Sequence, residues 1–327
     1  MSVASRTAAT TALVAAAGLA YAAVEAQWFT LRRVTVPVLP AGTGPLRVLH
    51  LSDQHLTPGQ HRKIAWVRSL ASLDPHLVID TGDNMAHLDA LPPLLHALEP
   101  LMRVPGAFVM GSNDYFAPVP KNPARYLYDD SRTRLTAAVH LPADRLADAL
   151  REAGWKDLTN RRDVLAVQGL TVALVGVDDP HLNRDHFPTA TRSHRSLVDR
   201  SLVDRPAVDL RLGVTHAPYR RVLDAMHVDG ADLVLAGHTH GGQLCVPGWG
   251  ALVTNCDLDT IRAKGLHGWP GPRPDEPFGD DSSWLHVSAG LGTSPYTPVR
   301  FACRPEATLL TLVAQGGPQR DRVSPVP

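Results

Sequence analysis

The feature that most constrains this chain is a set of five short apolar segments, each followed within a few residues by aspartate, histidine or asparagine. The segments occupy residues 47–52, 76–80, 107–110, 210–214 and 232–236. Runs of this length and composition are typical of buried strands. In open α/β sheets, ligands bind at the carboxyl ends of the strands, so the residues that follow these segments are the first candidates for a site. The pattern predicts an α/β protein with a polar site at the carboxyl ends of its strands.

The segments between and after these runs predict a layered architecture. Helix-like periodicity fills gaps at 64–70 and 144–150, and a further apolar run lies at 171–175. Strands that alternate with helices indicate an α/β fold in layers. The late apolar segments, 284–287 and 307–312, have no helix-like segment between them, which predicts a second sheet.

The composition is that of an ordinary folded protein with a large core. Of the 327 residues, 44% are hydrophobic, and 32 basic side chains balance 32 acidic ones. A formal charge of zero argues against a surface that is basic throughout, so we expect no stable complex with nucleic acid. Cys245, Cys256 and Cys303 are too few and too scattered for a disulfide framework, and none forms a Cys-x-x-Cys pair. We expect them to be buried thiols.

The N-terminus differs in composition from the rest of the chain. Residues 8–24 carry no charge and are rich in alanine, and a segment of this kind just reaches the roughly 17–25 residues that span a bilayer. Trp28, Arg32 and Arg33 follow, as at the end of a membrane anchor. We therefore predict a membrane protein with a single N-terminal anchor. A secreted protein cleaved near the small-x-small site at 20–22 is the first alternative, and a soluble helix is the second. The charges do not settle which side of the membrane the body faces.

These features divide the chain into four predicted parts. Residues 1–30 form the hydrophobic anchor or signal, and residues 31–45, rich in proline and glycine, suit an extended linker. The folded domain spans 46–314, and the polar, proline-containing residues 315–327 form a flexible tail.

Two pairs of polar residues make metal binding the favoured interpretation. Asp53 and His55, and likewise His238 and His240, are separated by one residue, and in extended backbone such side chains point the same way. A single aspartate or asparagine at a strand end is usually a turn or helix cap. The pairs are stronger evidence, because a histidine that only packs needs no such partner. Glycines flank the second pair and would let the backbone approach a ligand closely. The remaining alternative is an unrelated α/β binding protein in which the histidines only pack.

The order of the motifs supports a family resemblance. The motifs are Asp53-Gln54-His55, Gly82-Asp83, Gly111-Ser112-Asn113-Asp114, His216-Ala217-Pro218 and Gly237-His238-Thr239-His240. The series resembles the calcineurin-like binuclear metallophosphoesterase superfamily over residues 46–314. Its continuation through Gln243 is similar to a bacterial branch that an N-terminal helix often attaches to membranes. The resemblance implies a four-layer αββα sandwich of two mixed sheets flanked by helices, with an N-terminal membrane helix.

The resemblance also implies a ligand set for two metals. Asp53, His55 and His240 would hold one ion, Asn113, His216 and His238 would hold the other, and Asp83 would bridge them. Imidazole and carboxylate donors without thiolate suit Mn²⁺, Fe or Zn²⁺. A hydroxide that bridges the two ions would attack phosphorus in line, and the ions would stabilise the phosphoryl oxygens. We mark Asp83 and His238 as the catalytic candidates.

The turn at 111–114 departs from the family pattern, which is Gly-Asn-His followed by Asp or Glu. Without a gap, Ser112 stands at the metal-binding position. With a shift of one residue, Asn113 remains the ligand and Asp114 takes the place of the histidine. We favour Asn113 because an amide oxygen is a better donor than a neutral hydroxyl. Either way the usual leaving-group histidine is missing.

Other polar and aromatic residues are secondary candidates. His87 and His181 are candidates for contacts to substrate or to the metal ligands, although packing or surface roles are the simpler interpretation. Trp249, Trp269, Tyr296 and the segment 270–277 could form a rim over the site.

We therefore expect a metal-dependent phosphoesterase that acts on phosphodiesters, pyrophosphates or phosphomonoesters. The substrate could be a lipid or a nucleotide, presented near a membrane. The alternative is a catalytically silent metal-binding scaffold that docks a partner at the membrane, which the altered turn favours.

Overall fold

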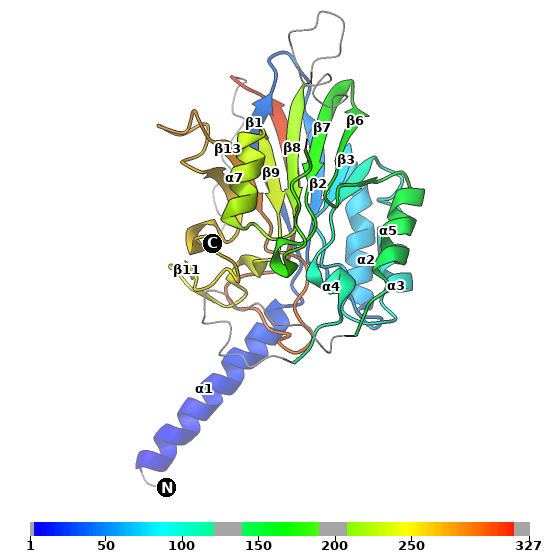
Figure 1. Ribbon diagram of the computed structural model, residues 1–327. Helices are drawn as coiled ribbons and strands as arrows, with labels where there is room; N and C mark the ends of the chain where they lie inside the picture. Colours follow the sequence, from blue (N-terminus) through cyan, green and yellow to red (C-terminus); the bar gives the residue numbers. More distant parts are fainter. Residues whose placement is uncertain (1–2, 121–138, 190–207, 317–327) are drawn as a thin grey trace, which may run out of the picture.

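The computed structural model describes residues 3–120, 139–189 and 208–316, and within them two six-stranded sheets pack face to face (Figure 1). The first sheet has the order β1-β14-β2-β3-β4-β5. Its strands are β1 (Thr30–Leu39), β2 (Leu46–Leu51), β3 (Leu77–Asp80), β4 (Gly106–Phe108), β5 (Lys156–Asp157) and β14 (Glu306–Ala314). The second sheet has the order β12-β13-β9-β8-β7-β6. Its strands are β6 (Arg162–Val167), β7 (Leu170–Gly176), β8 (Leu210–Thr215), β9 (Leu233–Ala236), β12 (Gly265–Trp269) and β13 (Ser283–Val287).

Helices cover the outer face of each sheet, which confirms the predicted four-layer αββα sandwich (Figure 1). One apolar core joins the two sheets, with Val48 and Ile79 from the first packing with Leu212 and Leu235 from the second. The first sheet packs outward on α2 (His61–Ser69), α3 (Leu91–Leu98) and α5 (Ala143–Glu152), and the second on α7 (Arg220–Val228). All three cysteines are free and buried, as predicted.

The pairing of the strands places the predicted site motifs at one end of both sheets. Strands β2, β3 and β4 run parallel, as do β7, β8 and β9. Parallel strands present their carboxyl ends at a common edge, so the loops that follow them meet there. The short segments in these loops are α4 (Ser112–Tyr115), η3 (Pro180–Leu182) and η4 (His240–Gly242), and the hairpin β10 (Cys245–Val246) and β11 (Gly250–Ala251) follows η4.

The segment predicted as a linker, 31–45, is instead mostly part of the first sheet. Residues 30–39 form β1, which pairs in parallel with β14, and Val36, Val38 and Leu39 are buried. Apolar residues at alternate positions give this strand one face for the core. Pro37 is tolerated because β1 is an edge strand, and the register shifts between Pro37 and Leu39. Of the predicted tail, residues 317–327 lie outside the described residues.

The N-terminal helix α1 (Val3–Glu25) projects from the body, but its last turns dock on the segment 300–303 (Figure 1). The N–H of Arg300 donates to the Ala22 carbonyl at 2.9 Å, and the buried Glu25 carboxylate accepts the N–H groups of Ala302 and Cys303. Among the described residues, α1 is the one helix that is long and apolar enough to cross a membrane. A signal sequence would have the same length and composition.

Candidate metal centre

Five loops at the carboxyl ends of the strands carry the seven predicted ligands. The loop after β2 carries Asp53 and His55, the loop after β3 carries Asp83, α4 carries Asn113, the loop after β8 carries His216, and the loop after β9 carries His238 and His240. All seven are buried or half-buried. Every one of them except Asp53 and His216 also lines a single cleft at this end of the sheets.

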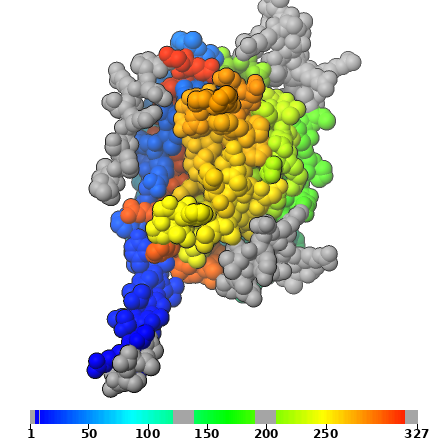
Figure 2. Space-filling model, turned by 90° about the vertical axis from the view of Figure 1, so that its left-hand side faces the viewer, coloured from blue at the N-terminus to red at the C-terminus, as the bar shows by residue number. Residues whose placement is uncertain are grey.

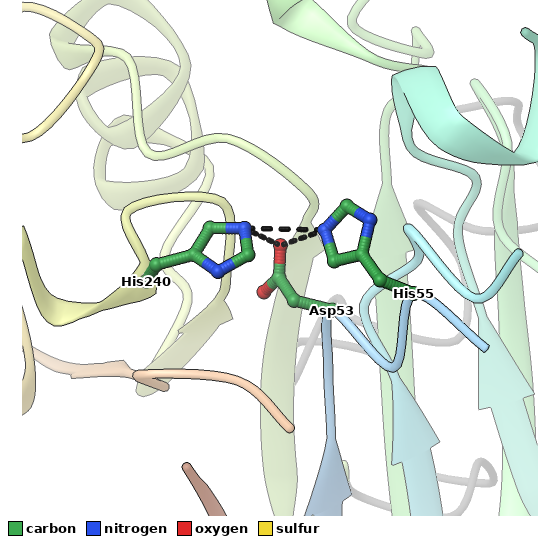
Figure 3. A group of neighbouring side chains, drawn as sticks. All are labelled: Asp53, His55 and His240. Atoms are coloured by element: carbon green, nitrogen blue, oxygen red, sulfur yellow. Dashed lines mark hydrogen bonds and ion pairs between the residues drawn. The ribbon is translucent and has the colours of Figure 1, made fainter. Parts of the chain in front are cut away.

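The first group of ligands combines side chains far apart in sequence (Figure 3). His240 Nε2 lies 3.1 Å from His55 Nε2 and 3.5 Å from Asp53 Oδ1. Asp53 Oδ1 lies 4.0 Å from His55 Nε2. These three atoms face one another closely enough to bind one cation.

Asp83 lies between this group and a second one. Its Oδ2 is 3.5 Å from His55 Nε2, and its Oδ1 is 3.5 Å from His216 Nε2. Asp53, Asp83 and His216 form a second group whose ligand atoms could hold a cation. His238 joins this side, because its Nδ1 is 3.3 Å from His216 Nε2. A carboxylate with one oxygen toward each group has the geometry of a bridging ligand.

Backbone carbonyls orient three of the four histidines. His240 Nδ1 lies 3.1 Å from the Gly292 oxygen, His216 Nδ1 lies 2.8 Å from the Thr81 oxygen, and His238 Nε2 lies 3.1 Å from the Asn255 oxygen. A carbonyl only accepts, so each of these ring nitrogens carries the proton and donates it. When the ring is neutral, its other nitrogen presents a lone pair to the centre, as metal-ligating histidines do.

The residues present fit divalent cations. Asp53 Oδ2 accepts the Ser52 hydroxyl and the N–H of His238, whereas Asp53 Oδ1 is buried and has no hydrogen-bond partner among the described residues. A buried carboxylate oxygen without a partner is unfavourable unless a cation or proton meets it. This oxygen faces His55 and His240, so a cation bound between the three would satisfy it.

Without a cation, the centre holds protons. Burial raises the pKa of Asp83 to about 8, although attraction to His216 opposes the shift. Burial acts to lower the pKa of His216, but the carboxylates of Asp83, Asp53 and Asp179 outweigh it and raise that pKa to about 9. Burial also lowers the pKa of both His55 and His240, which keeps these rings neutral.

We expect the binding of Mn²⁺ to tighten as the pH rises from 6 to 9. Metal ligands must be deprotonated, so protons held by Asp83 and His216 compete with the ion and are released when it binds. Each displaced proton changes the affinity by up to about tenfold per pH unit below the pKa of its group. Isothermal titration calorimetry in buffers of different ionisation heat counts these protons. The variant His87→Gln, at an exposed histidine outside the cleft, should release the same number, and an affinity independent of pH would contradict the expectation.

The turn at 111–114 places its residues in two different environments. Asn113 lines the cleft, donates its backbone N–H to Asp83 Oδ1 at 2.6 Å and donates its side-chain amide to the Phe116 carbonyl at 3.0 Å. Ser112 lines the cleft as well. Asp114 is fully buried, and its carboxylate accepts the N–H groups of Gly111, Asp83 and Asn84. Asp114 therefore holds the loops in place and does not face a substrate.

The secondary candidate residues lie in different parts of the structure. His181 in η3 lines the cleft, with its ring 4.5 Å from the His238 ring and its Nδ1 3.1 Å from the Tyr219 hydroxyl. His87 is half exposed and pairs with Asp89. Trp249 and Tyr296 are exposed, whereas Trp269 is buried in the core beside α7 and is no part of a rim.

The backbone of the loops is less regular than the expected extended geometry. Asp53, His55, Asp83, His238 and His240 all have φ between 41° and 70°, in the left-handed region that non-glycine residues rarely adopt. Asp53 and His55 do meet, but His238 and His240 separate, because His240 lies next to His55 and His238 lies next to His216. Such strain is typical of functional sites.

Two glycines allow these loops to pack. A Cβ on Gly237 would lie 1.9 Å from Ser52 Oγ, and one on Gly111 would lie 2.3 Å from Asp83 Oδ1. Gly237, beside the histidine pair, thus makes room for Ser52 and for the predicted ligand Asp53.

Arg300 is a supporting residue that the sequence did not reveal. It is fully buried, and its guanidinium donates to carbonyls in two segments that hold His240, including Gly292 at 2.6 Å and His240 itself at 3.3 Å. A lone arginine in the run Pro298-Val299-Arg300-Phe301 gives no signal of this role.

The chain is similar to known proteins along most of its length. A family model described as calcineurin-like phosphoesterase matches residues 46–242, which contain all seven predicted ligands. An uncharacterized metallophosphoesterase of Aquifex aeolicus (strain VF5) is 25% identical over 307 residues, covering 91% of this chain and 97% of that protein. Phosphodiesterase YaeI of Escherichia coli (strain K12) is 25% identical over 302 residues, covering 88% and 90%. UDP-2,3-diacylglucosamine pyrophosphatase LpxG of Chlamydia trachomatis is 25% identical over 296 residues, covering 81% and 83%.

Proposed function

This chain belongs to the calcineurin-like phosphoesterase family, and we propose that it uses two divalent metal ions to hydrolyse phosphodiester or pyrophosphate bonds. Phosphomonoesters are a further substrate class that the centre can accept. The proposal rests above all on Asp83, whose two carboxylate oxygens each lie 3.5 Å from a histidine of a different ligand group. A single cation would need no such shared carboxylate.

The residues have distinct roles in this proposal. Asp53, His55 and His240 would hold one ion, Asn113, His216 and His238 would hold the other, and Asp83 would bridge the two. Two such ions would supply a water of lowered pKa for attack on phosphorus and positive charge for the phosphoryl oxygens. Asp83 fixes the distance between the two groups of ligands. His238 lines the cleft and positions the ion that faces the substrate.

The names of two relatives support the choice of bond. One is a phosphodiesterase and another a pyrophosphatase of a diacylated nucleotide sugar. In both kinds of substrate the phosphate that is attacked carries two substituents, and the one that leaves is larger than a water molecule.

We propose that α1 is an uncleaved anchor, because Ala22 and Glu25 bind the segment 300–303 that also supports the site.

The test is metal analysis of the purified full chain together with an activity assay. We expect two Mn²⁺ per chain after loading, and hydrolysis of bis(p-nitrophenyl) phosphate that stops when a chelator removes the metal. Protein that binds two metals and hydrolyses no phosphate ester would contradict the proposed function. Fewer than two metals would favour the scaffold that docks a partner, for which the turn Gly111–Asp114 without its histidine is the motivating observation.

The turn at 111–114 lacks the histidine that usually assists the leaving group. We further propose that His181 donates a hydrogen bond to the leaving group in its place. It reaches the cleft beside His238, whereas Asp114 is turned away. His181→Gln should slow the hydrolysis of an alkyl phosphodiester by about 100-fold, the typical loss of positioned acid–base help. A p-nitrophenyl ester, which leaves without assistance, should be slowed far less. Equal losses with both esters would contradict this role, and His87→Gln serves as the control.

A further inference from the structure

We infer that the β10–β11 hairpin is a second membrane contact, which holds the metal cleft against the bilayer in which α1 is anchored. The substrate would then be a phosphoester that forms the headgroup of a lipid. The inference rests on the proposed function for the chemistry, and the membrane contact rests on the surface described below together with α1 as the membrane anchor.

The hairpin has an apolar surface exposed to solvent. Residues 241–256 contain no charged side chain. Within them Leu244 is 49% exposed, Val246 43%, Trp249 80% and Leu252 53%. A cluster of exposed apolar side chains on one element marks an interaction surface. Tryptophan at its tip is the residue most typical of a membrane interface.

This surface borders the metal cleft. Gln243 immediately precedes the exposed part of the hairpin, Asn255 follows it, and both line the cleft. On the neighbouring loop, Ser294 lines the cleft and Tyr296 is 53% exposed. Further along the wall lie Phe116, Ala117, Pro118, Val119 and Leu182. The cleft thus joins a polar floor of metal ligands to apolar walls, which suits a phosphate that carries an apolar group.

Hydrogen bonds connect the hairpin to α1 through one segment. Cys245 N–H donates to the Phe301 carbonyl at 2.8 Å, and Phe301 N–H donates to the Gln243 carbonyl at 3.1 Å. The Phe301 ring meets the Tyr21 ring of α1 edge-on, with centroids 5.7 Å apart. The base of the hairpin and the base of the helix are therefore fixed relative to each other.

The figures show the same arrangement from two sides. In Figure 1, α1 leaves the body at the end where α4 and β11 lie. In Figure 2, the yellow segment that contains the hairpin lies on the surface next to the place where the blue helix emerges. A bilayer around α1 would thus lie on the side of the hairpin and the cleft, which is why we identify the occupant of this surface as the bilayer.

The membrane contact can be tested without activity. The full chain is reconstituted in phosphatidylcholine–phosphatidylglycerol liposomes with brominated acyl chains, which quench tryptophans that reach the hydrocarbon. Trp249→Ser should remove part of the quenched fluorescence, whereas Phe278→Ser should not change it. Phe278 is a matched control because it is 94% exposed and precedes β13, whose carboxyl end faces the site. If the brominated lipids quench as much fluorescence in Trp249→Ser as in the unchanged protein, the hairpin does not enter the membrane and the inferred contact is overturned.

The lipid substrate is tested in the same liposomes. We compare hydrolysis of phosphatidylglycerol and of a nucleoside diphosphate-linked diacylglycerol with that of bis(p-nitrophenyl) phosphate. Trp249→Ser should lower the ratio of lipid to aryl turnover by about tenfold, the effect of losing one large apolar contact. Phe278→Ser should leave the ratio unchanged. Aryl turnover without release from either lipid would overturn the lipid substrate alone. Quenching without any turnover would instead contradict the proposed function and leave the membrane contact in place.

Discussion

Replacing Asp83 with asparagine should abolish measurable phosphodiester turnover, with a loss of about a thousandfold or more. The carboxylate directs one oxygen to His55 and the other to His216. An asparagine has only one oxygen and no charge, so it cannot serve two cations. Losing several kcal/mol of transition-state stabilisation corresponds to this factor. Metal analysis should show fewer than two ions per chain, and initial rates with bis(p-nitrophenyl) phosphate and excess Mn²⁺ measure the loss.

The stability of the metal-free Asp83→Asn variant separates loss of the centre from misfolding. Burial raises the pKa of Asp83 to about 8, which shows that a charge is unfavourable at this position without metal. A neutral amide should therefore leave the melting temperature of the metal-free protein unchanged or raise it. Asp89→Asn, at an exposed carboxylate of the same loop, is the control and should keep full activity. A variant at Asp83 that keeps two ions and full turnover would show that this carboxylate is no bridge.

The sequence predicted the fold well because each strand is indicated by residues that are adjacent in the chain. Each of the eight expected strands is a short apolar run, and each appears within one to three residues of its expected position. The polar residues after these runs supported the family resemblance that implied the ligand set, and Asp53, His55, Asp83, His216 and His240 do lie close together. The edge strand β1 was missed because Pro37, Pro40 and neighbouring glycines are equally typical of a linker. The pairing of β1 with β14, nearly three hundred residues later in the chain, is what places the valines of β1 in the core.

Long-range contacts set the rest of the site. The left-handed backbone at Asp53 and His240 depends on packing between loops, and no local pattern indicates it. Asp114 looked like a substitute for the missing histidine, but three backbone N–H groups hold its carboxylate away from the cleft. His181, by contrast, reaches the cleft from a loop that the motif series does not include.

Arg300→Met should destabilise the protein by about 3–5 kcal/mol, the usual result of removing one partner from a buried charged network. The guanidinium donates to the carbonyls of Ala289 at 2.7 Å, Gly290 at 3.1 Å and Gly292 at 2.6 Å, and methionine offers no donor to replace it. The melting temperature should fall by roughly 10 °C for a domain of this size. Thermal unfolding of the metal-free protein, followed by circular dichroism, measures this effect.

The same variant should also weaken metal binding, because Gly292 accepts both Arg300 and the ring N–H of His240. With the carbonyl free to move, the lone pair of His240 Nε2 is no longer aimed at Asp53 and His55. Arg300→Lys keeps the charge but not the planar fork of donors, so it should recover only part of the stability. Arg103→Met, at a surface arginine paired with Glu99, should change neither property. If Arg300→Met melted within about 2 °C of the unchanged protein and bound Mn²⁺ equally well, the carbonyls around His240 would have to be held by the remaining backbone contacts alone.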